Sequence, residues 1–226
     1  MRMLAVFRKG ERVRHIGHLD IQRAVQRGLR RSGLPVAYSN GFNPHIQVTF
    51  ASALSTGACG EREIMDVKMA EEVTPEIFLE KMNGAMPPEM KLIWARAVED
   101  RHPALMASLT AAEYRILFRD PAQGARLTAA LEAMTAQETI PAVRKTKTGM
   151  KDVDIKPLIY ALQAEENGLK CVLALTEREA CKPGMLIDAL KRAAGMDPEE
   201  EVRTLVTRTR LLGEGPDGAL APLETL

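Results

Sequence analysis

The sequence predicts an α+β protein made of two ferredoxin-like (split βαβ) antiparallel sandwich halves. Short apolar runs typical of strands alternate with segments of helical periodicity. The order strand–helix–strands–helix–strand occurs twice, before and after a connector near residues 100–110. The 226 residues, 46% hydrophobic and 27% charged, are enough for two small domains that each bury a core.

The first half is expected to span residues 1–107 and to contain a basic helix and a Gly-Phe-Asn-Pro-His loop. Apolar runs place its strands, and a Thr-Pro-Glu start at 74–76 places its second helix. The expected strands are 3–7, 35–38, 46–50, 64–69 and 91–97, and the expected helices are 18–32 and 75–82.

The second half is expected to span residues 108–226, with a basic hairpin at 143–155 and a loose tail from Gly213. The same kinds of pattern place its other elements. The expected strands are 113–118, 169–175 and 202–211, and the expected helices are 121–135 and 183–194.

Positive charge is concentrated near the N-terminus. The first 50 residues hold nine Lys and Arg and two acidic residues, a net charge of +7, whereas the whole chain carries only +1. A split of this size makes one face attractive to a polyanion.

The predicted helix at 18–32 has an apolar stripe and a separate basic stripe. Its apolar positions recur at helical spacing: Ile21, Val25, Gly28 and Leu29. Its basic positions follow two residues later: Arg23, Arg27, Arg30 and Arg31. We expect these arginines to bind phosphate groups, and we expect Glu63 to pair with one of them.

The turn from Gly41 to His45 is stiff, because Pro44 fixes the backbone and Gly41 can adopt positive φ. Phe42 would stack on a base while His45 orients that base. A structural turn with Phe42 in the core is the alternative.

A second basic segment runs from Arg144 to Lys156. Lys145, Lys147 and Lys151 could form one cationic row that extends the RNA-binding surface, because alternate strand residues point the same way. A solvated hairpin is the alternative.

Three histidines fall in the first half: His15, His18 and His45. They could serve as acid and base on RNA, hold a metal, or form a polar binding surface. We favour a polar binding surface, so we expect no metal, no cofactor and no catalytic residue.

The cysteine spacing and the hydropathy of the sequence indicate which metal sites and which cellular location to expect. Cys59, Cys171 and Cys181 are widely spaced without a CxxC motif, which argues against an iron–sulfur cluster or a cysteine-rich zinc site. Neither a signal peptide nor an apolar run of about 20 residues occurs, so we expect a cytoplasmic protein with no membrane contact.

Several motifs between residues 15 and 63 are specific enough to compare with known families. They are His18-Leu19-Asp20, Arg30 to Pro35, Tyr38 to His45, Ala53-Leu54 and Gly57 to Glu63. With the later segments 146–149 and 154–157, they resemble the radical SAM-linked protein family, whose uncharacterised members lie beside radical SAM enzymes or are fused to them. The resemblance implies a radical SAM enzyme as partner.

The chain lacks the three-cysteine motif of a radical SAM catalyst. We therefore expect a non-catalytic accessory or substrate-binding protein that binds RNA and works with a separate radical SAM enzyme. A metal-independent RNA-processing enzyme that uses its histidines is one alternative, and a protein–protein adaptor is another. The sequence leaves the oligomeric state open.

Overall fold

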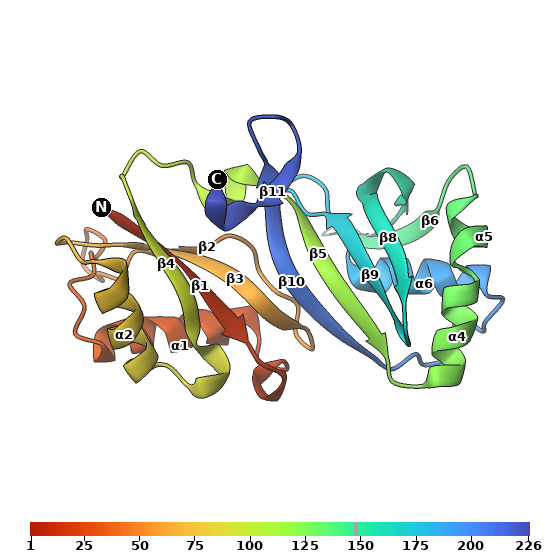
Figure 1. Cartoon of the computed structure of the whole chain (residues 1–226), viewed down its shortest axis with the longest axis horizontal. Coiled ribbons are helices and arrows are strands. Elements are labelled where there is room, and N and C mark those ends of the chain that lie inside the picture. The colour runs from red at the N-terminus through yellow and green to blue at the C-terminus, as the bar shows by residue number, and fades with distance from the viewer. Residues whose placement is uncertain (147–148) are drawn as a thin grey trace. The chain divides into compact units, whose positions relative to one another are not determined.

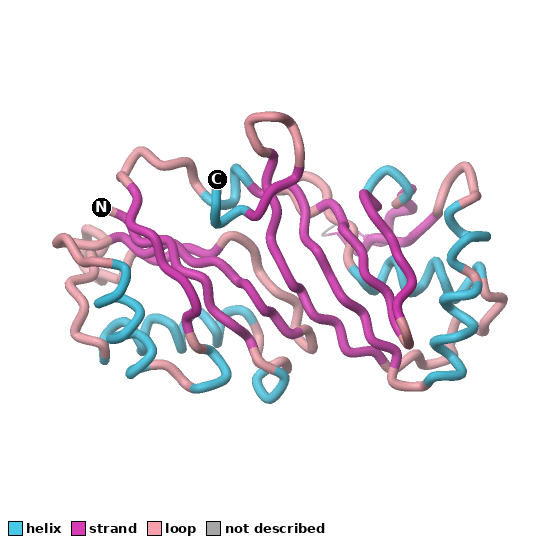
Figure 2. The backbone as a smooth tube through the Cα atoms, in the orientation of Figure 1, coloured by secondary structure: helices cyan, strands magenta, loops and turns pink. Residues whose placement is uncertain are grey.

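The computed structural model describes residues 1–146 and 149–226 and shows a mixed α+β fold with mostly antiparallel strand pairing (Figure 1 and Figure 2). The predicted α+β class is confirmed. The chain divides into two compact units. Unit 1 comprises Met1–Leu109 and Arg208–Leu226, and unit 2 comprises Thr110–Thr207. Within the described residues, no helix is long and apolar enough to cross a membrane.

Unit 1 contains a sheet with the strand order β4-β1-β3-β10, in which β2 also pairs with β3 and β11 with β10; β10 (Thr204–Glu214) belongs to this unit from Arg208 onward. Its elements are β1 (Arg2–Lys9), α1 (His18–Arg31), β2 (Val48–Phe50), β3 (Cys59–Lys68), α2 (Pro75–Ala85), β4 (Leu92–Val98), α3 (Leu105–Ser108) and β11 (Leu220–Pro222). The expected strand at 35–38 is reduced to isolated bridges that Val36 and Tyr38 form. Pro35 has no N–H group to donate to a ladder, which shortens this pairing.

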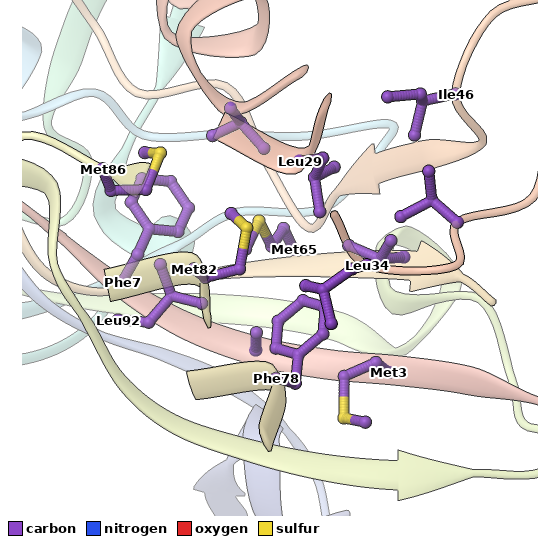
Figure 3. Packing of buried hydrophobic residues seen from close by; sticks show 14 of the residues in the cluster. Met3, Phe7, Leu29, Leu34, Ile46, Met65, Phe78, Met82, Met86 and Leu92 are labelled. Atoms are coloured by element: carbon purple, nitrogen blue, oxygen red, sulfur yellow. The ribbon is translucent and has the colours of Figure 1, made fainter. Parts of the chain in front are cut away.

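Both long helices of unit 1 pack on one face of the sheet. On β1, Met3, Ala5 and Phe7 alternate onto this face, and they join one buried apolar cluster with residues of α1 and α2. Figure 3 shows Leu29 of α1 and Phe78 of α2 in this cluster. The amphipathic spacing of the sequence therefore decides which face of each helix is buried.

Gly28 lies in the middle of α1, where glycine costs about 1 kcal/mol relative to alanine. A Cβ at this position would lie 2.5 Å from the sulfur of Met86. The glycine therefore permits the close approach of α1 to the end of α2.

Unit 2 has the strand order β10-β5-β9-β8, and β6 and β7 form a separate two-stranded sheet. Unit 2 holds the first four residues of β10, and unit 1 holds the rest. The elements are β5 (Leu109–Phe118), α4 (Pro121–Ala129), α5 (Leu131–Thr135), β6 (Pro141–Thr146), β7 (Gly149–Asp154), β8 (Ile159–Glu165), β9 (Gly168–Ala174), α6 (Pro183–Ala193) and β10 (Thr204–Glu214).

Two features of unit 2 differ from the sequence prediction. The expected helix at 121–135 is divided at Ala130, near Thr128, whose hydroxyl donates to the Gly124 carbonyl at 2.9 Å. Such back-bonding bends helices. The strand β8 was not predicted, because most of its side chains are exposed and it lacks a clear apolar alternation.

The C-terminal residues belong to unit 1, whereas the sequence assigns them to the second half as a loose tail. Residues 220–225 instead form β11 and a 3-10 turn, and Leu223 is buried. Glu224 accepts a hydrogen bond from Arg62 Nε at 2.7 Å, which fixes this segment to β3. These long-range contacts have no local signature in the sequence.

Candidate nucleic-acid interface

The helix α1 separates a buried apolar face from an exposed basic face. The predicted apolar stripe is confirmed, and its members are all buried: Ile21, Val25, Gly28 and Leu29. The arginines of the basic stripe are all exposed: Arg23, Arg27, Arg30 and Arg31. The spacing that buries one stripe therefore directs the other to solvent.

The four arginines differ in their partners. Arg23 forms an ion pair with Asp20 at 3.0 Å, and Arg31 Nη2 donates to the Ala85 carbonyl at 2.5 Å. Arg27 and Arg30 have neither a hydrogen bond nor an ion pair within the residues that the structure describes. These two guanidinium groups are therefore the most available for an anionic ligand.

The turn from Gly41 to His45 is closed by three hydrogen bonds. The Ser39 N–H donates to the His45 carbonyl at 2.9 Å, and the His45 N–H donates to Ser39 Oγ at 3.1 Å. Ser39 Oγ also lies 2.9 Å from His45 Nδ1. Gly41 has φ +120°, which L side chains rarely adopt. The turn is held by these contacts and presents the fully exposed side chain of Phe42.

The residues after this turn alternate between the core and solvent. His45, Gln47 and Thr49 are exposed, whereas Ile46 and Phe50 are buried. The exposed side chains border a groove of about 480 Å³ on unit 1. Its polar lining consists of Arg2, His45, Gln47, Thr49, Asp66, Lys68 and His102.

The charges of this groove are largely compensated. Arg2 Nε donates to the two carboxylate oxygens of Asp66 at 3.0 and 3.2 Å, and this contact raises the pKa of Arg2. Lys68 Nζ lies 2.5 Å from a carboxylate oxygen of Asp100, and this hydrogen bond lowers the pKa of Asp100. The other lining residues are polar or apolar: His45, Gln47, Thr49, His102, Ile46, Val48 and Ala104.

His18 lies in a different environment from His45. It is half-buried, with its ring edge-to-face with Phe50 at 5.4 Å between centroids and 82° between planes. Burial lowers the pKa of His18, although the nearby charge of Glu63 opposes this effect. The adjoining cavity of about 10 Å³ has room for about one water molecule.

Glu63 pairs with Arg208, so the expected pair with an arginine of α1 is wrong. Arg208 Nε donates to Glu63 Oε1 at 2.9 Å, and a second contact joins Nη2 to Oε2. The reason is that β3 neighbours β10 in the sheet, whereas the arginines of α1 face solvent. A Cβ on Gly60 would lie 2.6 Å from Glu63 Oε1, so this glycine leaves room for the carboxylate.

The second basic segment forms the hairpin of β6 and β7. The register pairs Lys145 with Met150 and Arg144 with Lys151. Directly paired residues share a face, so Lys151 lies on the same face as Arg144. Lys151 is exposed, and Lys147 lies outside the described residues.

The structure separates the histidines that the catalytic alternative requires together. His18 and His45 line different cavities, and His15 is exposed on the segment before α1. His45 shares its groove with His102. Within the described residues, no group of three or more His, Cys, Asp and Glu side chains is placed to hold a metal ion.

The cysteines of unit 2 are poor nucleophiles. Burial raises the pKa of Cys171 to about 12 and that of Cys181 to about 11. Both thiols are therefore protonated at neutral pH.

Sequence reasoning overlooked Gln47, Thr49 and His102. The alternation of polar and apolar residues from His45 to Phe50 is the signal that could have identified the first two. His102 comes from a connector far along the chain, and no local pattern links it to His45.

No curated protein matches the sequence of this chain. A family model described as an uncharacterized protein conserved in bacteria (DUF2344) matches residues 2–183. The match covers the basic helix, the 41–45 turn and the groove, as well as most of unit 2. The chain therefore belongs to this bacterial family of uncharacterized proteins, DUF2344.

Proposed function

We propose that this protein is a non-catalytic accessory that binds RNA and works with a separate radical SAM enzyme. The RNA part of the proposal rests on the side chains of unit 1. The partner is inferred from the resemblance of residues 15–63 to the radical SAM-linked proteins. We also propose a cytoplasmic location, where the RNA substrate and reduced thiols are both expected.

The observation that carries the proposal is the position of Phe42. A fully exposed phenylalanine at the tip of a turn held by hydrogen bonds contributes no packing to the fold. Bases stack on such aromatic rings, and each stack contributes about 1–3 kcal/mol to binding. The turn holds the backbone that carries Phe42, which lowers the entropy cost of presenting the ring to a base.

The arginines of α1 supply the electrostatic part of RNA binding. Arg27 and Arg30 are exposed without partners among the described residues, so binding a phosphate breaks no existing ion pair. Lys151 and Arg144 on one face of the β6–β7 hairpin, together with Lys145 and Lys147, are proposed as additional phosphate contacts.

We propose that each unit is a ferredoxin-like half. The strand order β4-β1-β3-β2 in unit 1 and the order β10-β5-β9-β8 in unit 2 support this interpretation, with β6 and β7 as an inserted hairpin. Four-stranded sheets of this kind bind single-stranded RNA in other proteins.

The test is an RNA titration of the variant Arg27→Glu/Arg30→Glu. Fluorescence anisotropy with a single-stranded RNA should give a log–log salt slope for the wild type of about −3 from the four α1 arginines, and a steeper slope where the hairpin also contacts phosphate. Losing two contacts should weaken binding and reduce the slope by about 1.4. Both positions are exposed, so the thermal melt should not change.

The matched control is Arg178→Glu/Arg203→Glu, which changes the net charge equally at two exposed positions of unit 2. This control should retain most of the affinity. Equal losses in both double variants would show that only net charge matters, and the basic face of α1 would then have no specific role. Cleavage of the RNA by the wild type would favour the enzyme alternative.

A further inference from the structure

The groove of unit 1 next to the 41–45 turn has a polar wall built by strand alternation. His45, Gln47 and Thr49 are exposed on the groove side, and Ile46 and Val48 between them supply an apolar part of the same lining. Thr49 of β2 is paired with Asp66 of β3, and both residues line the groove. The pairing of these two strands therefore fixes the position of Thr49 relative to Asp66. The groove volume of about 480 Å³ lies in the range of small-ligand sites.

The charged side chains of the groove are already paired with one another or with neighbouring residues. Arg2 is engaged by Asp66 and by the Pro103 carbonyl at 3.3 Å, and Lys68 is engaged by Asp100. An anion would have to displace these contacts. The arrangement therefore favours a ligand without net charge.

The wall retains unused hydrogen-bonding capacity. His45 uses Nδ1 with Ser39, which leaves Nε2. Gln47 donates its amide to the Tyr38 carbonyl at 2.9 Å, which leaves its side-chain oxygen as an acceptor. The Thr49 hydroxyl has no hydrogen bond within the described residues and can both donate and accept.

We propose that this groove binds the base of one unpaired nucleotide. A nucleobase has apolar faces and carries donors and acceptors on one edge, which matches a lining that combines apolar Ile46 and Val48 with the polar groups of His45, Gln47 and Thr49. The inference rests on the proposed RNA-binding function and assigns base recognition to His45, Gln47 and Thr49. Phe42, on the adjacent turn, then supplies stacking and the groove supplies base preference. The α1 arginines lie on the helix-covered side of the sheet and would contact phosphates of another part of the RNA.

The four histidines provide a direct readout in the full-length protein. His45 and His102 line the groove, whereas His15 and His18 do not. Histidine ring signals in NMR spectra, assigned through single His→Gln variants, should be followed during titration with adenosine, cytidine or uridine at millimolar concentration. At least one nucleoside should shift His45 and His102 saturably and leave His15 and His18 unchanged, and ribose alone should shift none.

Substitution of the wall tests which groups read the base. Gln47→Ala/Thr49→Val should weaken nucleoside binding by about tenfold, the loss expected for two neutral hydrogen bonds. The matched control Gln137→Ala/Thr139→Val makes the same changes at exposed positions of unit 2 and should have no effect. Both double variants should keep the wild-type melting temperature because the altered side chains are exposed.

Absence of a saturable response at His45 and His102 with every nucleoside would overturn the inference, as would equal shifts at all four histidines. If the wild type binds single-stranded RNA without any nucleoside response, the groove assignment fails and the proposed function stands. If nucleosides bind but RNA does not, the proposed function fails and the groove remains a base site.

Discussion

Unit 1 has two regions with a histidine, one around His18 and one around His45, and they differ in how far their polar side chains are buried. Around His18, the charged residues Lys9, Glu63 and Arg208 are at most 4% exposed. Around His45, the aromatic ring of Phe42 is fully exposed, and the exposed side chains of Gln47 and Thr49 border an open groove. The first region directs its polar groups to other parts of the protein, and the second directs them to solvent.

The difference in burial indicates which residues stabilise the fold and which are available to bind a ligand. Burying a charge is costly unless a partner compensates it, so Glu63 and Arg208 each depend on the other to remain buried in unit 1. Exposed residues such as Phe42 and Arg27 make no comparable contribution to stability. Their substitution should therefore affect binding and not folding.

The largest expected effect is on the buried ion pair. Glu63→Gln keeps the shape of the side chain but leaves the charge of Arg208 uncompensated in the interior. We expect a loss of about 3–5 kcal/mol in the free energy of unfolding, measured by urea denaturation.

The control for this substitution is Asp20→Asn, which breaks the exposed ion pair with Arg23. Exposed pairs contribute at most about 1 kcal/mol. If Glu63→Gln costs no more than Asp20→Asn, the buried pair does not stabilise unit 1 as described.

The next effect concerns Phe42. Phe42→Ala should weaken RNA binding by about 1–3 kcal/mol, because a base loses its stacking partner. Its free energy of unfolding should change by less than about 0.5 kcal/mol, as is usual for exposed positions.

Phe78→Ala, in the core of unit 1, gives the opposite pattern and should cost about 3–5 kcal/mol of stability. Urea denaturation and RNA titration of both variants make this comparison. A large stability loss in Phe42→Ala would contradict the exposed position of this ring, and unchanged RNA affinity would remove the stacking role.

The smallest effect is a pH dependence from His18. Its pKa in the folded protein is below the ordinary value of 6.5, because burial disfavours the charged imidazole. As the pH falls below 6.5, the unfolded state takes up a proton first, so the free energy of unfolding should decrease.

Urea denaturation between about pH 7.5 and pH 5 would measure this decrease. His18→Gln should reduce it, whereas His15→Gln, at an exposed position, should not. An identical pH dependence in the wild type and in His18→Gln would show that burial of this imidazole does not contribute.

Local patterns predicted much of the fold. The spacing of Ile21, Val25, Gly28 and Leu29 identified the buried face of α1, because helical periodicity involves only neighbouring turns. Thr74 was recognised as a helix cap for the same reason, and its hydroxyl accepts from the Ile77 N–H.

Contacts between residues far apart in the sequence could not be predicted from local patterns. Glu63 and Arg208 are 145 residues apart, and no spacing rule brings them together. The groove depends on the pairing of β2 with β3 and on a connector residue, His102, so only its alternating wall was accessible from the sequence. The exposure of Phe42 was also undecided, since a phenylalanine in a turn fits both a core and a surface position.

The proposed function depends on RNA binding by unit 1 through the 41–45 turn. Ultraviolet crosslinking of the full-length protein to single-stranded RNA, followed by mass spectrometry of the modified peptides, tests it most directly. The peptide containing Phe42 should carry the main crosslink, and Phe42→Ala should remove it. A protein that forms no crosslink, or one whose crosslinks fall only on peptides of unit 2, would contradict the claim.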